Sequence, residues 1–307
     1  MKHLKVFFLL LFLATVGCGS DSDDDDGQSN TVGGGQSSEE SFRALVFSRT
    51  AGFRHASIEA GVLTIQQLGE ENGFEVDATE DHTLINSENL ANYELLIFLN
   101  TTLDVLEAEQ EQAFEQYIRG GGNFVGVHSA ADTEHDWPFY GEVVGAYFQA
   151  HPVLNQPGSL RVEDPEHPSV AHLDNPWQIP FEEYYSFSSN PRGSVRVLLN
   201  IDEGSYLQTP NTSCDPSGPT FPQGFSGKMG DHPMSWCHDK FAGRVWYTAL
   251  GHEIYLYFTP EFREHLLKGI FTAVGRIPAS CEVNPKPAEL PEYIEPELTG
   301  CEQLVLP

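Results

Sequence analysis

The sequence has few basic residues, since 16 Lys and Arg stand against 45 Asp and Glu and the net charge is −29 at pH 7. Lys and Arg form no cluster anywhere along the chain. A protein that binds nucleic acid needs a basic surface to neutralise phosphates, so the composition argues against nucleic acid as a partner. An acidic surface of this kind bears on solubility and says little about chemistry.

Long hydrophobic runs are scarce, and the apolar run at residues 6–14 is too short to span a bilayer. It follows Lys2 and Lys5, as the hydrophobic core of a signal peptide does. The run leads to Thr15-Val16-Gly17-Cys18, which resembles a bacterial lipobox, so we expect residues 1–18 to be a lipoprotein signal peptide with lipidation at Cys18. Cleavage of an ordinary secreted protein is the alternative. Because the residue immediately after Cys18 is Gly19 and not Asp, we expect an exported protein anchored by lipid to the bacterial outer membrane, on its periplasmic or surface face.

The next segment, residues 19–41, is rich in Asp, Gly and Ser and cannot bury enough apolar surface to fold. We therefore predict a disordered tether there. The sequence ends with a Pro-rich tail at residues 277–307. Between the tether and this tail, we predict an α/β domain without internal repeats at residues 42–276.

Cysteine is also scarce, and no short C-x-x-C pair of the kind that binds zinc is present among the five. Apart from Cys18 an even number remains, and in an oxidising compartment such a number predicts disulfides. One bond would close the Pro-, Gly- and Ser-rich segment 209–230, and the other would tie down the tail. The pairs that we expect are Cys214 with Cys237 and Cys281 with Cys301.

Apolar runs without alternation predict strands that are covered on both faces, as in a parallel sheet. Between these runs, apolar residues recur at helical spacing, and Ser57 is the expected N-cap of the first helix. Helices placed between strands in this way form the crossovers that join parallel strands. The pattern predicts a doubly wound parallel sheet. The predicted strands are 43–48, 74–78, 95–99, 124–127, 160–163, 195–202 and 244–250, and the predicted helices are 58–72, 106–118, 137–147 and 260–274.

The strand at 124–127 breaks abruptly into the polar turn His128-Ser129-Ala130-Ala131-Asp132. Ligands of open α/β sheets bind at the carboxyl ends of the strands, so this turn is the expected position of a site. His55 and His252 follow two other predicted strands. One loop histidine is usually a capping or surface residue, but three at separate strand ends of one sheet indicate a shared function.

Several polar residues of the long loops have a simpler interpretation. His151 and His232 precede prolines and can be turn formers. Glu182 and Glu183 can be solvated or salt-bridged, unless burial under an aromatic side chain raises a carboxyl pKa into the range useful for proton transfer. Trp236 can belong to the core, although an aromatic wall also suits a sugar ring.

Residues 47–276 resemble the ThuA-like (trehalose utilisation) family, within the class I glutamine amidotransferase-like superfamily. The resemblance implies an α/β, flavodoxin-like, doubly wound and mostly parallel sheet with helices on both faces. The matching segments are Thr50-Ala51-Gly52-Phe53-Arg54-His55, Gly126-Val127-His128-Ser129-Ala130, Ala150-His151-Pro152, Glu183-Tyr184, Pro233-Met234-Ser235-Trp236-Cys237-His238 and Gly243 to His252.

The superfamily usually hydrolyses amides with a cysteine on a G-x-C-x-G turn between a strand and a helix. Here His128 stands at the position of that cysteine, and no thiol occurs between residues 19 and 213. Ser129 is one position out of register. A cysteine-dependent amidotransferase reaction is therefore excluded on this turn.

Similarity to trehalose-utilisation proteins implies a small-molecule carbohydrate as substrate, such as a keto-disaccharide. We hypothesise that His128 and His252 act as base and acid, with Glu183 orienting the substrate or donating a proton. A divalent metal such as zinc, held by histidines and a carboxylate, is the second possibility. The rival function is a non-catalytic glycan-binding or envelope lipoprotein that touches the membrane only through its lipid. The expected substrate-binding residues are His55, His151, Trp236, His238 and Arg244, the last of which can instead be structural.

Overall fold

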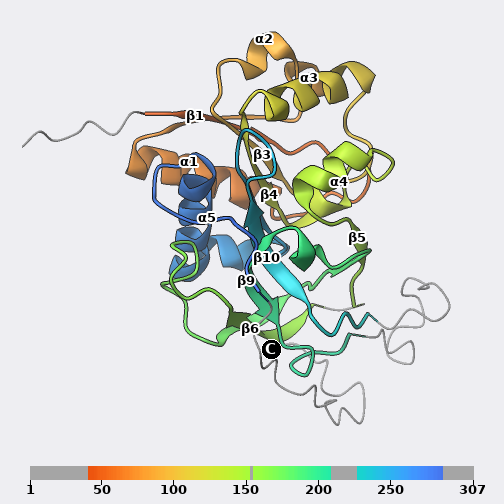
Figure 1. Cartoon of the computed structure of the whole chain (residues 1–307), viewed down its shortest axis with the longest axis vertical. Coiled ribbons are helices and arrows are strands. Elements are labelled where there is room, and N and C mark those ends of the chain that lie inside the picture. The colour runs from red at the N-terminus through yellow and green to blue at the C-terminus, as the bar shows by residue number, and fades with distance from the viewer. Residues whose placement is uncertain (1–40, 153–154, 209–226, 286–307) are drawn as a thin grey trace, which may run out of the picture. The chain divides into compact units, whose positions relative to one another are not determined.

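The computed structural model describes residues 41–152, 155–208 and 227–285. The predicted signal peptide with Cys18, the tether up to residue 40, Cys214, and the tail from residue 286, with Cys301, lie outside the described residues. The elements in chain order (Figure 1) are β1 (Arg43–Phe47), α1 (Ile58–Asn72), β2 (Glu75–Thr79), η1 (His82–Leu84), α2 (Ser87–Leu90), β3 (Leu95–Leu99), α3 (Ala108–Arg119), β4 (Asn123–Val127), η2 (His128–Asp132), α4 (Pro138–Val144), β5 (Phe148–Ala150), β6 (Gln156–Val162), β7 (Trp177–Glu182), β8 (Ser186–Phe187), η3 (Pro191–Gly193), β9 (Arg196–Ile201), β10 (Pro233–His238), β11 (Val245–Thr248), η4 (Ile254–Phe258) and α5 (Pro260–Ala273).

One half of the main sheet is parallel, with the strand order β2-β1-β3-β4-β11. This is the order 2-1-3-4-5 of flavodoxin-like sheets. All five residues of β3 are buried, as its unbroken apolar run predicts. The predicted doubly wound α/β fold is confirmed, and the carboxyl ends of these parallel strands meet at one edge of the sheet.

The other half of the sheet continues from β11 through β10, β9, β6 and β7, and each of these pairings is antiparallel. β6 and β9 overlap the strands predicted at 160–163 and 195–202. The sequence pattern does not predict β7 or β10, because prolines and polar residues break up the apolar runs in both segments. β5 and β8 form a separate antiparallel pair.

Helices cover both faces of the parallel half (Figure 1). α1 and α5 contact each other on one face. On the other face, Phe114 of α3 and Tyr140 of α4 pack their rings against Phe98 and Phe124 of the sheet. Within the described residues, no helix has the length and apolarity that crossing a membrane requires.

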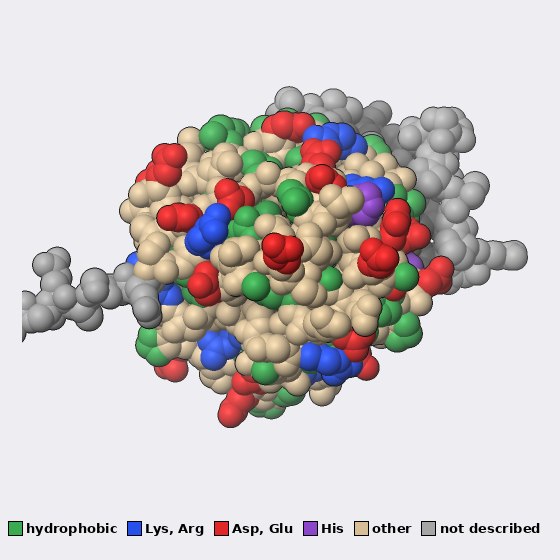
Figure 2. Space-filling model, turned by 90° about the horizontal axis from the view of Figure 1, so that it is seen from above, with side chains coloured by type: hydrophobic (Ala, Val, Ile, Leu, Met, Phe, Trp, Pro, Cys, Tyr) green, Lys and Arg blue, Asp and Glu red, His purple; other side chains and the backbone are tan. Residues whose placement is uncertain are grey.

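The face shown in Figure 2 carries many acidic side chains, and the basic side chains are scattered among them. Several of the arginines are paired: Arg43 with Glu75 and Asp77, and Arg54 with Glu59.

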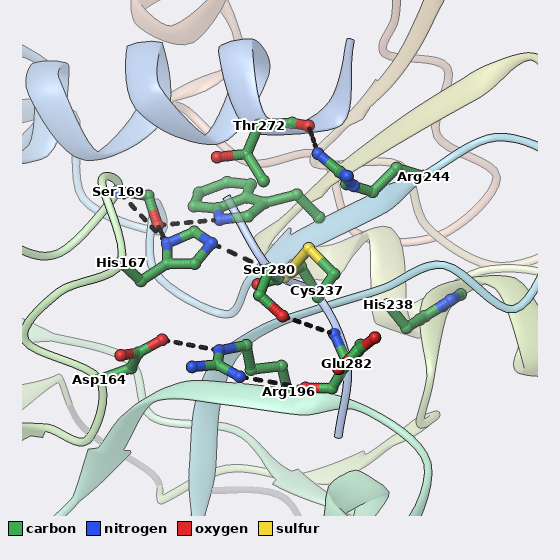
Figure 3. The surroundings of a disulfide bond; sticks show 12 residues. Asp164, His167, Ser169, Arg196, Cys237, His238, Arg244, Thr272, Ser280 and Glu282 are labelled. Carbon is green, nitrogen blue, oxygen red and sulfur yellow. Dashed lines mark hydrogen bonds and ion pairs between the residues drawn. A yellow bond between two sulfur atoms is a disulfide. The ribbon is translucent and has the colours of Figure 1, made fainter. Parts of the chain in front are cut away.

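The described disulfide joins Cys237 of β10 to Cys281, which lies beyond α5 (Figure 3). Both predicted pairings are therefore wrong, because each had assigned one of these two cysteines to a different partner. The reason is the path of the chain after α5. The carbonyl of Glu282 accepts from Arg196, and Asn284 exchanges two hydrogen bonds with the backbone of Val197. This segment runs back along β9 and brings Cys281 to β10.

Candidate functional site

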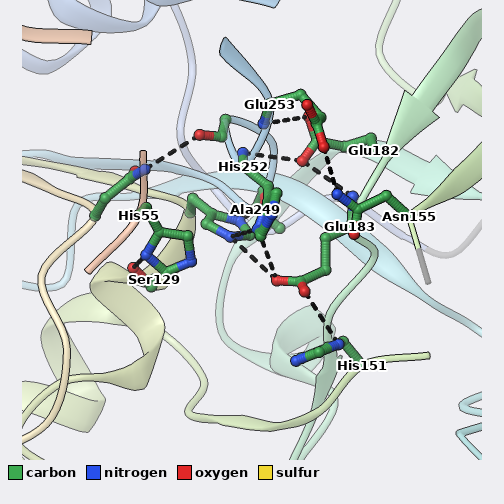
Figure 4. A network of polar contacts seen from close by, with 12 residues as sticks. His55, Ser129, His151, Asn155, Glu182, Glu183, Ala249, His252 and Glu253 are labelled. Carbon is green, nitrogen blue, oxygen red and sulfur yellow. Dashed lines mark hydrogen bonds and ion pairs between the residues drawn. The ribbon is translucent and has the colours of Figure 1, made fainter. Parts of the chain in front are cut away.

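Four side chains from distant parts of the sequence meet at the carboxyl edge of the parallel strands (Figure 4). His55 lies in the loop after β1, His128 follows β4, His252 follows β11, and Glu183 follows β7 of the antiparallel half. One ligand atom from each lies within 4.8 Å of the others. The three histidines that were expected at the strand ends therefore come together, and Glu183 joins them.

His128 occupies a sharp turn between β4 and η2 with a backbone φ of +50°. A positive φ is rare for a residue with a Cβ and is found where surrounding structure enforces it, often at functional sites. Gly126 lets Tyr247 pack closely against β4 just before the turn, because a Cβ there would lie 2.9 Å from the Tyr247 ring. The turn predicted from the amidotransferase-like resemblance is thus present, with an imidazole in place of the thiol.

The hydrogen bonds of His128 determine which of its ring nitrogens faces the cluster. Nδ1 donates to the carbonyl oxygen of Ala249 over 2.7 Å. In the neutral imidazole, Nε2 then carries a lone pair. The ring is fully buried and stacks on Tyr185, with 4.3 Å between the ring centroids. His128 is consequently fixed in position, tautomer and direction.

Three polar atoms form a compact triangle at the centre of the cluster. Nε2 of His128 lies 3.4 Å from Oε2 of Glu183, and Nδ1 of His252 lies 3.1 Å from the same oxygen. The two imidazole nitrogens are 3.3 Å apart. A tetrahedral zinc ion with Zn–N and Zn–O bonds near 2.0–2.2 Å separates its ligand atoms by about 3.3 to 3.5 Å. The triangle therefore matches one face of such a coordination sphere.

His55 covers this triangle from the side of β1. Its ring lies edge-on to the rings of His128 and His252, with centroid distances of 4.8 and 5.1 Å. Nδ1 of His55 is 3.3 Å from Oγ of Ser129. The Ser129 hydroxyl thus contacts a site histidine.

Glu183 links the cluster to the surface through its second oxygen. Oε1 lies 3.1 Å from Nδ1 of His151, whose side chain is 31% exposed, compared with 20% for His252 and 8% for Glu183. The open side of the site therefore lies toward His151 and His252. The structure brings His151 to the site, as the sequence predicted.

The family model described as trehalose utilisation (ThuA) matches residues 43–273. The chain belongs to the ThuA family. A ThuA-like protein from Bacteroides uniformis is 24% identical, with a TM-score of 0.60 over 75% of this chain and 89% of its own. One from Parabacteroides merdae is 18% identical, with a TM-score of 0.59 over 85% and 96%. These structures share the fold. A search of curated proteins finds none that matches the sequence.

The pKa values of the titratable groups at this ThuA site are strongly shifted. Burial lowers the pKa of His55 to about 2, and burial also lowers the pKa of His128, so both rings are neutral at pH 7. Burial opposes ionisation of Glu183, but its contacts with His128 and His252 hold its pKa well below the usual range. Burial likewise opposes the charge of His252, but its bond to Glu183 raises its pKa. The site thus holds one carboxylate, two imidazoles that burial keeps neutral, and His252, whose protonated form Glu183 favours.

The residues present fit a divalent metal by chemistry as well as by distance. Neutral imidazoles and a carboxylate are the ligands that zinc takes in catalytic sites. A histidine that binds a metal usually donates its other N–H to a carbonyl or carboxylate, as His128 does to Ala249. His128, His252 and Glu183 could bind the ion, with His55 adjacent.

Glu182 has a role at this ThuA site that sequence reasoning missed. Its side chain is fully buried, and its carboxyl oxygens accept the backbone N–H groups of His252, Glu183 and Glu253 over 2.9, 3.1 and 3.4 Å. Asn155 in turn donates to the Glu253 side chain. Glu182 therefore fixes the backbone of two cluster residues. The available signal was its position beside Glu183.

The structure does not bring Trp236, His238 or Arg244 to the site. Trp236 is fully buried and donates to the carbonyl of Val144. His238 pairs with Val245, the first residue of β11, and donates to the carbonyl of Val143. Arg244 precedes β11 and donates to the carbonyl of Thr272. His238 and Arg244 lie at the end of β11 opposite the site, and Trp236 is enclosed in the core. These three residues therefore serve the core and not the substrate, and Arg244 does not pair with Glu183.

Proposed function

We propose that this ThuA protein is a divalent-metal-dependent enzyme that acts on a sugar. The triangle of His128, His252 and Glu183 carries the proposal, because its sides of 3.1 to 3.4 Å match the spacing of zinc ligands. His55 supplies either a fourth ligand or a neutral partner for a bound water molecule. Zinc of this kind polarises a carbonyl group or lowers the pKa of a bound water.

The same triangle disfavours a mechanism in which His128 and His252 act as base and acid on either side of a reacting carbon. The facing nitrogens of His128 and His252 are only 3.3 Å apart, which is a direct contact distance and leaves no space for a substrate atom between them. His128 is also fully buried, and its second nitrogen is committed to Ala249. Both residues are therefore better suited to hold an ion than to exchange protons with substrate.

The substrate class comes from the family, whose description is trehalose utilisation. A keto-disaccharide suits the proposed chemistry, since its carbonyl oxygen is a group that a metal ion can polarise. His151 and His252 border the open side and can bind sugar hydroxyl groups. In the cell, we place the enzyme on the outer membrane, held by lipid at Cys18, with no other membrane contact.

The test uses residues 19–307 produced without the lipid. Metal content per chain is measured by mass spectrometry, and turnover is measured with keto-disaccharides made by oxidising trehalose. We expect about one divalent ion per chain, lost together with turnover in His128→Ala, His252→Ala and Glu183→Gln. His135→Ala is the matched control, because His135 is an exposed histidine paired with Asp132 outside the cluster.

Three results would contradict the proposal in different ways. Turnover without a bound ion would return the site to acid–base chemistry. Full activity in the three cluster variants would remove the site from the reaction altogether. Sugar binding without turnover of any keto-disaccharide would favour the non-catalytic glycan-binding alternative.

A further inference from the structure

Phe53 is an exposed aromatic residue beside the metal-binding cluster. Its side chain is 66% exposed, whereas most of the large aromatic residues described are buried in the core. The Phe53 ring lies 4.9 Å from the ring of His55 at an interplanar angle of 82°. His55 in turn contacts the rings of His128 and His252. Phe53 thus stands one residue away from the proposed metal ligands.

The backbone around Phe53 is held in place, so the exposed ring does not reflect a loose loop. Thr102, beyond β3, accepts the N–H of Gly52 at its hydroxyl and donates that hydroxyl to the carbonyl of Phe53. Its own carbonyl accepts the N–H of Ala51 over 2.9 Å. Gly52 permits the close approach, because a Cβ there would lie 2.8 Å from Leu103. An aromatic side chain on a fixed backbone loses little entropy when a ligand covers it.

The charges near Phe53 favour a neutral ligand. Arg54, the next residue, is bound by both Glu59 and Glu80 at 2.9 Å. The net charge of −29 repels anions at long range. A phosphorylated or carboxylated sugar would therefore meet an acidic surface and an arginine that is already paired.

We infer that Phe53 is the stacking platform of a subsite for an uncharged pyranose ring next to the cluster of His55, His128, Glu183 and His252. The inference rests on the proposed function and specifies its substrate. A pyranose has an apolar face of C–H groups and a rim of hydroxyl groups. The face covers the Phe53 ring and removes apolar surface from water, while the rim reaches the polar groups of the site.

The test measures binding of trehalose by metal-loaded wild type, Phe53→Ala and Phe53→Trp. Phe258→Ala is the matched control, because Phe258 is 57% exposed and has no ring contact with a site histidine among the described residues. We expect Phe53→Ala to raise the Kd for trehalose and the KM for the keto-disaccharide about tenfold, equivalent to about 1.4 kcal/mol, with kcat and metal content unchanged. Phe53→Trp retains binding, and trehalose alters its fluorescence. Trehalose 6-phosphate binds more weakly than trehalose.

The outcomes separate this inference from the proposed function. Equal trehalose affinity in Phe53→Ala, Phe258→Ala and wild type overturns the platform alone, provided that wild type turns over the keto-disaccharide. Loss of metal in Phe53→Ala shows that Phe53 only shields His55 and also overturns it. Binding of trehalose 6-phosphate as tight as that of trehalose refutes the preference for a neutral ring. If wild type neither binds trehalose nor turns over the keto-disaccharide, both proposals fail.

Discussion

Replacing Glu182 by Gln should weaken metal binding, although Glu182 does not belong to the cluster. Its carboxylate accepts the backbone N–H groups of His252 and Glu183 at Oε1 and that of Glu253 at Oε2. Burial raises the pKa of Glu182, and N–H donors at both oxygens oppose that rise. One buried group therefore holds the main chain of two proposed ligands.

The size of the effect follows from this hydrogen-bond pattern. Gln has the shape of Glu, but one of its two terminal atoms is an NH2 group, which cannot accept a hydrogen bond. At least one of the three backbone N–H groups must therefore face another donor. An unsatisfied buried N–H costs about 1–3 kcal/mol. Loss of an outer partner of a metal ligand usually lowers metal affinity 10–100-fold, equivalent to about 1.4–2.8 kcal/mol. We expect Glu182→Gln to fall within this range.

The assay is competition for zinc against a chelator of known affinity, on variants whose folding is checked by circular dichroism. Glu134→Gln is the matched control, because Glu134 is also a buried carboxylate that accepts two backbone N–H groups, those of Val105 and Leu106, outside the cluster. Zinc affinity equal to wild type in folded Glu182→Gln would refute the reasoning. An equal loss in both variants would show a general effect of core carboxylates.

Three further predictions concern stability. Replacing Cys237 and Cys281 by Ser opens a disulfide that spans 44 residues and should lower the free energy of unfolding by about 4 kcal/mol in urea titrations; no change would mean that the bond does not form. Burial raises the pKa of Glu134 to about 7, so the folded state binds the proton more tightly and stability should fall as pH rises from about 4.5 through 7, by at most about 3 kcal/mol. Glu134→Gln should remove this contribution, so that stability falls less over this range than in wild type, and an unchanged pH profile would contradict the assignment. Gly126→Ala should cost about 1–3 kcal/mol in the same titrations, because the new Cβ collides with Tyr247; wild-type stability would show that the turn adapts.

The parallel half of the fold and most of the site could be predicted from the sequence for the same reason. Runs such as Leu95–Leu99 have no polar residue, which marks strands covered on both faces. The carboxyl ends of parallel strands share one edge, so residues that follow different strands come together. His55, His128 and His252 meet on this principle, and their meeting requires no knowledge of side-chain packing.

The errors arise where the chain leaves the parallel pattern. β10 runs antiparallel to β11, which moves His238 to the edge opposite the site although it lies close to His252 in sequence. The Cys237–Cys281 bond depends on the return of the chain along β9, which leaves no periodic signal. The role of Glu182 depends on three backbone N–H groups, two of them about 70 residues away. Each of these depends on tertiary contacts that local patterns do not encode.

The turn at His128 explains why we propose that this site binds a metal and does not act through a covalent intermediate. A nucleophile must be free to approach its substrate, and a metal ligand must stay where it is. His128 is fully buried, its Nδ1 is bound to Ala249, and its ring stacks on Tyr185. The hydroxyl of Tyr247 also donates to its carbonyl over 2.8 Å. A side chain restrained at so many points cannot attack a substrate, whereas its Nε2 is aimed at Glu183 and His252 with the fixed direction that a ligand needs.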